Sequence, residues 1–254
     1  MLISIVIPAY NEENNIGNTI DKIRGVFDQM KVDFEWEIIV CDNNSKDKTA
    51  EVASQHGART IFEPINQISR ARNTGASIAT GDWLLFIDAD SYPTVGLMED
   101  TLHLIEKGEH IGCGCTVEVI SGTKFNKVRM ERLNPFYRLF KQCGGVFILV
   151  EREAFIAIEG FSERLYAYEE FNFIENLKKH GRSQGKKFSV LHKNPVQTSG
   201  RKGEIKFSSI FTLIFSQVFA ILFLLIHWLL PENVMEKYGR KLLGYWYKDR
   251  EESC

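Results

Sequence analysis

"WLLFIDADSYP", Trp83 to Pro93, is an apolar run that ends on two aspartates separated by one alanine. The run up to Ile87 is typical of a strand that is buried on both faces, as in a parallel sheet. Asp88 and Asp90 follow at i, i+2 spacing, which aims both side chains into one space. The two carboxylates repel each other, so a cation would stabilise the pair. Hard oxygen ligands suit Mg²⁺ or Mn²⁺, which substrate phosphates often complete.

Strand and helix patterns alternate around this run. Apolar residues between Ile16 and Met30 recur at helical spacing, and a second helix is expected near residues 68–79. This alternation predicts an α/β fold with a mostly parallel sheet flanked by helices. The other strands are expected at residues 2–7, 36–41, 60–62, 111–119, 144–150 and 187–192.

Polar loops follow several of the predicted strands. Ligands of open parallel sheets bind beyond the carboxyl ends of the strands. That edge should hold Asp88 and Asp90, the loop at residues 8–11, and Asp42 after the second strand. The glutamates at residues 169–170 precede a helix in the second half. Each feature has a structural alternative: Asp42 suits an Asx-turn, and the glutamates suit a helix N-terminus. Their expected meeting at one edge favours a shared ligand site.

Four segments resemble family 2 glycosyltransferases with the GT-A (Rossmann-like) fold in order and spacing. They are "SIVIPAYNEENNI", "EIIVCDNNSKDKT", "SRARNTGASIATGDWLLFIDAD" and "GFSERLYAYEEFNF". The resemblance covers roughly residues 1–195. It implies an inverting, metal-dependent enzyme that moves a sugar from a nucleotide-diphosphate sugar to a hydroxyl or phosphate acceptor, with Mg²⁺ or Mn²⁺ as cofactor.

The resemblance also implies which residues meet the nucleotide sugar. The aspartate after the second strand would meet the base, and the two arginines of "SRARNTG" would approach the base or the diphosphate. A solvated helix face is the alternative for both arginines. The implied nucleotide-sugar-binding residues are Pro8, Ala9, Tyr10, Glu12, Asp42, Arg70, Arg72 and Asp88.

The metal ligands and the general base follow from the same resemblance. Asp90 would be the direct metal ligand, with Asp88 nearer the ribose or the sugar. His192 falls where some members place a further metal ligand, and a structural histidine is the alternative. Glu170 takes the place of the general base, with Glu169 as the alternative. The family usually has aspartate at the second position, so Glu170 has a longer reach.

The C-terminal region has a different composition. Residues 207–230 contain no Asp, Glu, Lys or Arg, and at about 1.5 Å per residue they cover a hydrocarbon core of about 30 Å. Basic residues just before them suit a cytoplasmic membrane surface. We therefore expect a GT-A domain at 1–204 and, at 205–254, a hydrophobic membrane-associated helix with a polar tail. This helix would span the bilayer or lie in its interface; a helix docked on the domain is the alternative.

The partners are less constrained. A net charge of −2 gives no general attraction to nucleic acid. The basic and aromatic stretch at 124–142 falls where the resemblance places the acceptor region. A lipid-linked acceptor is one expectation for it, and an ordinary amphipathic helix is the alternative.

The competing functions are a non-catalytic, membrane-anchored nucleotide-sugar-binding domain and a sugar-phosphate nucleotidyltransferase. The intact carboxylates argue against the first, and the loop "PAYNEENN", which is not glycine-rich, argues against the second.

Overall fold

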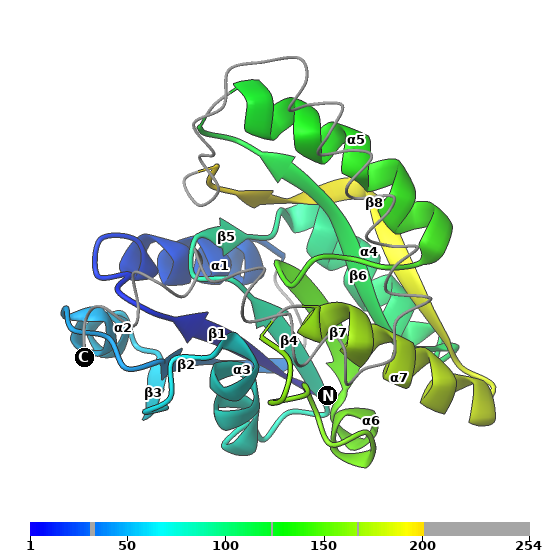
Figure 1. Cartoon of the computed structure of the whole chain (residues 1–254), viewed down its shortest axis with the longest axis horizontal. Coiled ribbons are helices and arrows are strands. Elements are labelled where there is room, and N and C mark those ends of the chain that lie inside the picture. Colours follow the sequence, from blue (N-terminus) through cyan, green and yellow to red (C-terminus); the bar gives the residue numbers. More distant parts are fainter. Residues whose placement is uncertain (31–33, 123, 167, 201–254) are drawn as a thin grey trace.

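The computed structural model describes residues 1–30, 34–122, 124–166 and 168–200 (Figure 1). These residues form one eight-stranded sheet with the strand order β3-β2-β1-β4-β7-β6-β8-β5. The strands are β1 (Leu2–Ala9), β2 (Glu35–Asp42), β3 (Arg59–Phe62), β4 (Trp83–Ile87), β5 (Ser91–Tyr92), β6 (His110–Val119), β7 (Phe147–Glu151) and β8 (Lys187–Thr198). The helices are α1 (Ile16–Met30), α2 (Thr49–Gln55), α3 (Ile68–Ser77), α4 (Val95–Glu106), α5 (Lys124–Phe140), α6 (Arg152–Ala157) and α7 (Glu169–Ser183).

Most strands of the sheet run in one direction. β1 pairs in parallel with β2 and β4, and β2 pairs in parallel with β3, as predicted. β7 is antiparallel to both β4 and β6, and β5 is antiparallel to β8. β6 and β8 pair in parallel, so β1, β2, β3, β4, β6 and β8 all run in one direction. The α/β class and the mostly parallel sheet are therefore confirmed, and β5 and β7 are the strands that run against the others. The chain returns through α5 into β7, which lies between β4 and β6.

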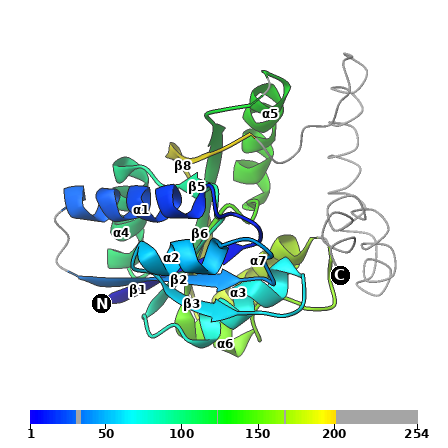
Figure 2. The same cartoon turned by 90° about the vertical axis from the view of Figure 1, so that its left-hand side faces the viewer.

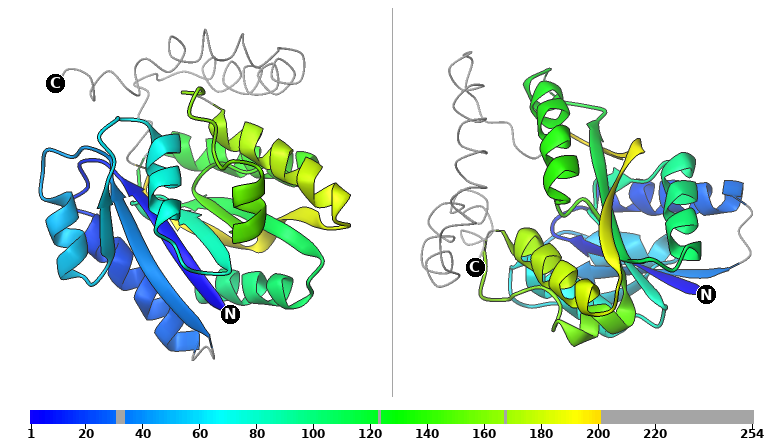
Figure 3. Two further views of the ribbon diagram at one scale, coloured as in Figure 1. Left: turned by 90° about the horizontal axis from the view of Figure 1, so that it is seen from below. Right: turned by 90° about the vertical axis from the view of Figure 1, so that its right-hand side faces the viewer.

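Two apolar cores lie on opposite faces of the sheet. Side chains alternate along β1, so Ile5 joins the core under α1 and α4, whereas Val6 joins the core under α3, α6 and α7. Figure 2 shows α1 and α2 on one face with α3 and α6 on the other. Figure 3 shows α7 on the α6 side from two further directions. Burying one such isoleucine contributes about 1.5–3 kcal/mol.

An aromatic cluster joins the end of β4 to the start of α7. The ring of Phe161 stacks on Phe173 with centroids 4.1 Å apart and meets Phe86 edge-on at 5.1 Å. Phe155 of α6 packs against the same three rings. Aromatic pairs of this kind contribute about 0.5–1.5 kcal/mol beyond their buried area. The cluster fixes the segment before α7 beside the aspartates that follow β4.

The predicted hydrophobic helix at 207–230 and the second part at 205–254 lie outside the described residues. Within the described part of the chain, no helix is long and apolar enough to cross a membrane.

Candidate active site

The turn that carries the two aspartates is held by hydrogen bonds from distant elements. Thr19 of α1 donates its hydroxyl to the carbonyl of Ala89 (2.7 Å). The backbone N–H of Ser199, just beyond β8, donates to the carbonyl of Asp90 (3.1 Å). Asp88 leads into the turn from β4, and its carbonyl accepts a further backbone hydrogen bond within it. The two carboxylates therefore project from a fixed frame at the end of β4.

Two serine hydroxyls orient the Asp90 carboxylate. Ser199 donates to Oδ2 (2.7 Å) and Ser91 to Oδ1 (3.3 Å). The short pairing of β5 with β8 brings these serines together, because Ser91 lies opposite Thr198. Asp90 is 8% exposed, so its oxygens are held in place rather than left to rotate in solvent. Sequence reasoning missed both serines because a two-residue strand has no periodicity to detect.

Arg72 of α3 is buried between carboxylates from two directions. Its guanidinium is 1% exposed, and Nη2 lies 3.5 Å from Oδ1 of Asp88 and donates to the carbonyl of Gly145 (3.2 Å). Nη1 lies 3.5 Å from Oε1 of Glu169 and 3.6 Å from Oε1 of Glu170. Arg72 thus links Asp88 to the glutamate pair, and its expected contact with the nucleotide stays a prediction.

Gly145 makes this arrangement possible. A Cβ at this position would collide with Nη2 of Arg72 and with Oε1 of Glu170. Only glycine lets the backbone carbonyl approach the guanidinium so closely. Sequence reasoning missed Gly145, whose signal is the "GG" before β7.

The glutamates occupy two different environments at the start of α7. The residue before them, Tyr168, has a left-handed backbone with φ of 67°, a strained conformation typical of functional sites. The side chain of Glu169 is 6% exposed and that of Glu170 is 20% exposed. Burial raises the pKa of Glu169 to about 8, the charge of Glu170 adds to this rise, and Arg72 opposes it. Glu169 therefore holds a proton near neutral pH, and Glu170 is the more accessible carboxylate.

The raised pKa of Glu169 predicts a pH dependence of stability. Between about pH 5 and pH 8 the folded state keeps a proton on Glu169 that the unfolded state releases. The free energy of unfolding therefore falls as the pH rises through this window, by on the order of 3 kcal/mol. We expect Glu169→Gln to flatten this slope in denaturant titrations. The exposed control Glu99→Gln should leave the slope unchanged, and an unchanged slope in Glu169→Gln would contradict the assignment.

Other side chains of α3 hold the segment that leads to the glutamates. Asn73 exchanges two hydrogen bonds with the backbone of Phe161 (2.9 and 3.0 Å). Gln67 donates to the carbonyls of residues 163 and 165 (both 2.9 Å). Arg70, expected near the base or diphosphate, forms an ion pair with Glu163 (2.8 Å). Three side chains, those of Gln67, Arg70 and Asn73, thus position this segment.

Arg72 also predicts a stability difference within α3. Arg72→Leu should lower the free energy of unfolding by about 3 kcal/mol, because it leaves the partly buried carboxylates of Asp88 and Glu170 without their counter-charge. Arg70→Leu is the matched control on the same helix: its ion pair is partly exposed, so we expect a loss of at most about 1 kcal/mol. Urea titration of both variants measures the difference. Equal losses would show that burial of Arg72 carries no special weight.

The loops after β1 and β2 lie at the same edge of the sheet as the aspartates after β4. Asp42 is 8% exposed, and its Oδ1 accepts the backbone N–H of Ser45, three residues further on (3.0 Å). The N–H of Asn43 donates to the carbonyl of Ala9 (2.8 Å) and ties the two loops together. Asn11 and Asn44 have left-handed backbones, with φ of 52° and 63°. This edge therefore combines a carboxylate with turns that only a few residue types adopt.

The remaining residues expected to border the nucleotide are Pro8, Tyr10 and Glu12, which lie at the end of β1 and in the loop before α1. Pro8 pairs with Cys41 inside the sheet, and Tyr10 is half-buried in the loop that follows. Glu12 is 1% exposed, and its Oε2 accepts the amide of Asn15 (3.0 Å). Its carbonyl accepts the first hydrogen bonds before α1. Glu12 therefore supports the start of α1, and the loop around Tyr10 faces the edge.

The two aspartates fit a divalent cation, and His192 lies elsewhere. Magnesium ions are commonly held by one or two carboxylates, and substrate phosphates complete the coordination. Asp88 and Asp90 can supply these carboxylates. Among the residues that the structure describes, no group of three or more His, Cys, Asp or Glu side chains converges as a metal site. His192 is exposed and lines a cavity under α5. The contacts of this region with Asp90 come from Ser199, just beyond the end of β8, and His192 itself lines the cavity under α5 instead.

Similarity to known structures shows that this fold is of the GT-A type. A mannosyltransferase from Pyrobaculum calidifontis, solved with GDP-Man and Mn²⁺, superposes with a TM-score of 0.61 at 16% identity, over 80% of this chain and 58% of that one. Residues 4–164 match the sequence profile of "Glycosyl transferase family 2". The chain belongs to this family. The matched range includes Asp42, Asp88 and Asp90 and ends before the glutamate pair.

Curated relatives are similar over part of their length. An uncharacterized glycosyltransferase of Haemophilus influenzae is 26% identical over 190 residues, which are 69% of this chain and 62% of the relative. The UDP-Glc:alpha-D-GlcNAc-diphosphoundecaprenol beta-1,3-glucosyltransferase of Escherichia coli is 26% identical over 149 residues, 56% of each chain. This chain thus spans less than two thirds of either relative.

Proposed function

We propose that this protein is an inverting, metal-dependent glycosyltransferase that uses a nucleotide-diphosphate sugar. The observation that carries the proposal is the single buried guanidinium of Arg72, which lies within 3.6 Å of Asp88 on one side and of Glu169 and Glu170 on the other. One aspartate of the pair after β4 and the carboxylate suited to a base thus meet around one residue.

The donor would bind across the ends of β1, β2 and β4. Asp42 and the loop around Tyr10 would border the base, Asp88 would lie nearer the ribose or the sugar, and Asp90 would approach the diphosphate. A divalent cation held by Asp90, and bordered by Asp88, would offset the negative charge that develops on the departing nucleotide diphosphate. The hydrogen bonds from Ser91 and Ser199 keep the Asp90 oxygens in one orientation, which reduces reorganisation during the reaction.

The acceptor would enter beside Glu170. The proton of the acceptor hydroxyl passes to the Glu170 carboxylate, while the acceptor oxygen bonds to the anomeric carbon of the donor sugar. The bond from that carbon to the diphosphate oxygen breaks, and the electron pair leaves with the nucleotide. Because attack comes from the face opposite the leaving group, the anomeric configuration inverts. Such general-base help contributes about 10²–10⁴ in rate.

The protein would act at the cytoplasmic face of a membrane on a lipid-linked acceptor. Two observations support this part of the proposal: the uncharged stretch at 207–230, and the diphosphoundecaprenol acceptor in the name of the Escherichia coli relative. We expect the full chain to sediment with membranes and to be released when residues 205–254 are deleted. Sedimentation of the deleted form with membranes would contradict an anchor in this stretch.

Turnover of a nucleotide sugar tests the catalytic proposal. The full chain, incubated with UDP-glucose, UDP-N-acetylglucosamine or GDP-mannose, should release the nucleoside diphosphate with Mn²⁺ or Mg²⁺ but not with EDTA. Binding of these donors without any release of diphosphate, with lipid acceptors present, would favour the binding-domain alternative. Release of pyrophosphate from a nucleoside triphosphate and a sugar phosphate would favour the nucleotidyltransferase.

A further inference from the structure

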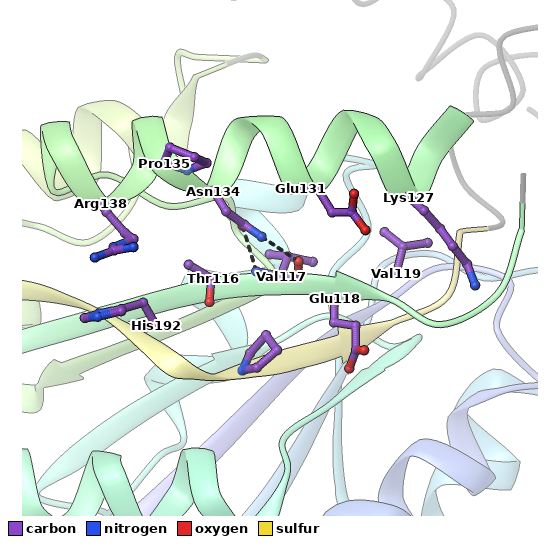
Figure 4. A pocket seen from close by; sticks show the side chains of 11 residues that line it. Thr116, Val117, Glu118, Val119, Lys127, Glu131, Asn134, Pro135, Arg138 and His192 are labelled. Atoms are coloured by element: carbon purple, nitrogen blue, oxygen red, sulfur yellow. Dashed lines mark hydrogen bonds between the residues drawn. The ribbon is translucent and has the colours of Figure 1, made fainter. Parts of the chain in front are cut away.

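A cavity lies between α5 and the strands β6 and β8. Its volume is about 540 Å³, within the range of small-molecule sites in proteins. None of the residues that line it belongs to the aspartate turn or to the glutamate pair. The side chains that give the cavity its polar character are Thr116, Glu118, Lys127, Glu131, Arg138 and His192 (Figure 4).

The cavity exists because α5 covers an edge of β6 that no strand pairs with along the described chain. β7 pairs with β6 only through residues 112–114. Beyond that point Asn134 of α5 accepts the N–H of Val117 and donates to its carbonyl, both at 3.0 Å. These two bonds hold the helix across the strand while leaving space on either side. The cavity is therefore a built feature of the fold.

Charge is unevenly distributed along the cavity. Figure 4 shows Arg138 and His192 at one end, from α5 and β8, with Thr116 of β6 between them. Glu118 and Glu131 lie toward the end marked by Lys127. Lys127 and Arg138 are eleven residues apart on one helix, about 16 Å at 1.5 Å per residue. One end thus presents hydrogen-bond donors for an anion, and the other presents carboxylate acceptors.

We propose that this cavity binds a phosphorylated sugar, with the phosphate between Arg138, His192 and Thr116 and the sugar hydroxyls beside Glu131 and Glu118. A guanidinium recognises phosphate through two parallel N–H···O bonds. Carboxylates accept hydrogen bonds from hydroxyls, whereas they would repel a second anion. The proposal places the ligand outside the donor site and does not depend on the transferase reaction.

The ligand has two sources with the same chemistry, a soluble sugar phosphate and a lipid whose head group is a phosphorylated polyol. The exposed apolar side chains Leu139 and Phe140 follow Arg138 in the last turn of α5 but do not line the cavity. Two arms of one experiment separate these sources. Glucose 1-phosphate is titrated into the full chain by calorimetry. The full chain is also sedimented with phosphatidylcholine vesicles with and without phosphatidylinositol, and the readout is the increase caused by phosphatidylinositol, because residues 205–254 are expected to bind both kinds of vesicle.

In whichever of the two arms binding is detected, Arg138→Gln should weaken that binding about tenfold or more, because it removes a charged hydrogen-bond donor to the phosphate. His192→Asn should weaken it as well. The matched control is Arg132→Gln, an exposed arginine of the same helix that does not line the cavity. Thermal melting and UDP binding with Mn²⁺ report whether the fold and the donor site persist. Absence of saturable binding in both arms, or equal weakening by Arg132→Gln, would overturn the proposal.

Discussion

Replacing Asp90 with asparagine is expected to lower kcat by about 10²–10³, the loss typical when one preorganised electrostatic contact to developing charge is removed. The amide removes the negative charge that would hold a divalent cation, and it keeps an oxygen that can accept from Ser199. The variant should therefore fold and lose metal-dependent turnover. Initial rates at several Mn²⁺ concentrations measure the effect, with half-saturation by Mn²⁺ shifted to higher concentration.

The control for this prediction is Asp28→Asn, an exposed aspartate of α1 far along the chain from the site. It makes the same chemical change and should leave both kcat and the Mn²⁺ dependence unchanged. If Asp90→Asn kept the activity of the unchanged protein at every Mn²⁺ concentration, Asp90 would not be a metal ligand in the reaction.

Replacing Glu170 with glutamine is expected to lower kcat by about 10²–10⁴, with little change in the KM for the donor. Glutamine has the same shape but cannot take a proton from the acceptor hydroxyl. The KM should change little because Glu170 acts on the acceptor side, whereas the donor contacts come from the aspartates and the loops after β1 and β2. Steady-state rates with the donor varied at saturating acceptor separate the two constants.

Glu169→Gln distinguishes the two glutamates. Glu169 is buried and holds a proton near neutral pH because burial and the charge of Glu170 raise its pKa, so its replacement should cost far less activity. A loss in Glu169→Gln larger than in Glu170→Gln would assign the base to Glu169 instead. Unchanged kcat in both variants would remove the general base from the mechanism.

The first half of the fold is predictable because each strand there leads through a loop into a helix. Apolar runs ended on Asp42 and Asp88, and the structure places both at the ends of parallel strands. The helix α4 went unpredicted although Thr94 caps it by accepting the N–H of Leu97 (3.2 Å). The antiparallel β7 could not be predicted, since its direction depends on which neighbours it joins in space.

The candidate site was predictable in its residue types and only partly in its contacts. Strand-end spacing predicts that Asp88 and Asp90 share a space. Helical periodicity does not reveal that Arg72 is buried, because its partners Glu169 and Glu170 are about a hundred positions away in the sequence. Contacts between segments so distant depend on the packing of α3 against the segment before α7, which no local pattern encodes.

The central claim, that the carboxylates after β4 hold a divalent cation against a nucleotide diphosphate, is tested most directly by a crystal structure of the full chain with UDP and Mn²⁺. The account predicts an anomalous manganese peak within about 2.5 Å of a carboxylate oxygen of Asp90, with the diphosphate completing the coordination and the base near Asp42. A manganese ion bound away from both aspartates, or UDP bound without contact to this edge, would contradict it.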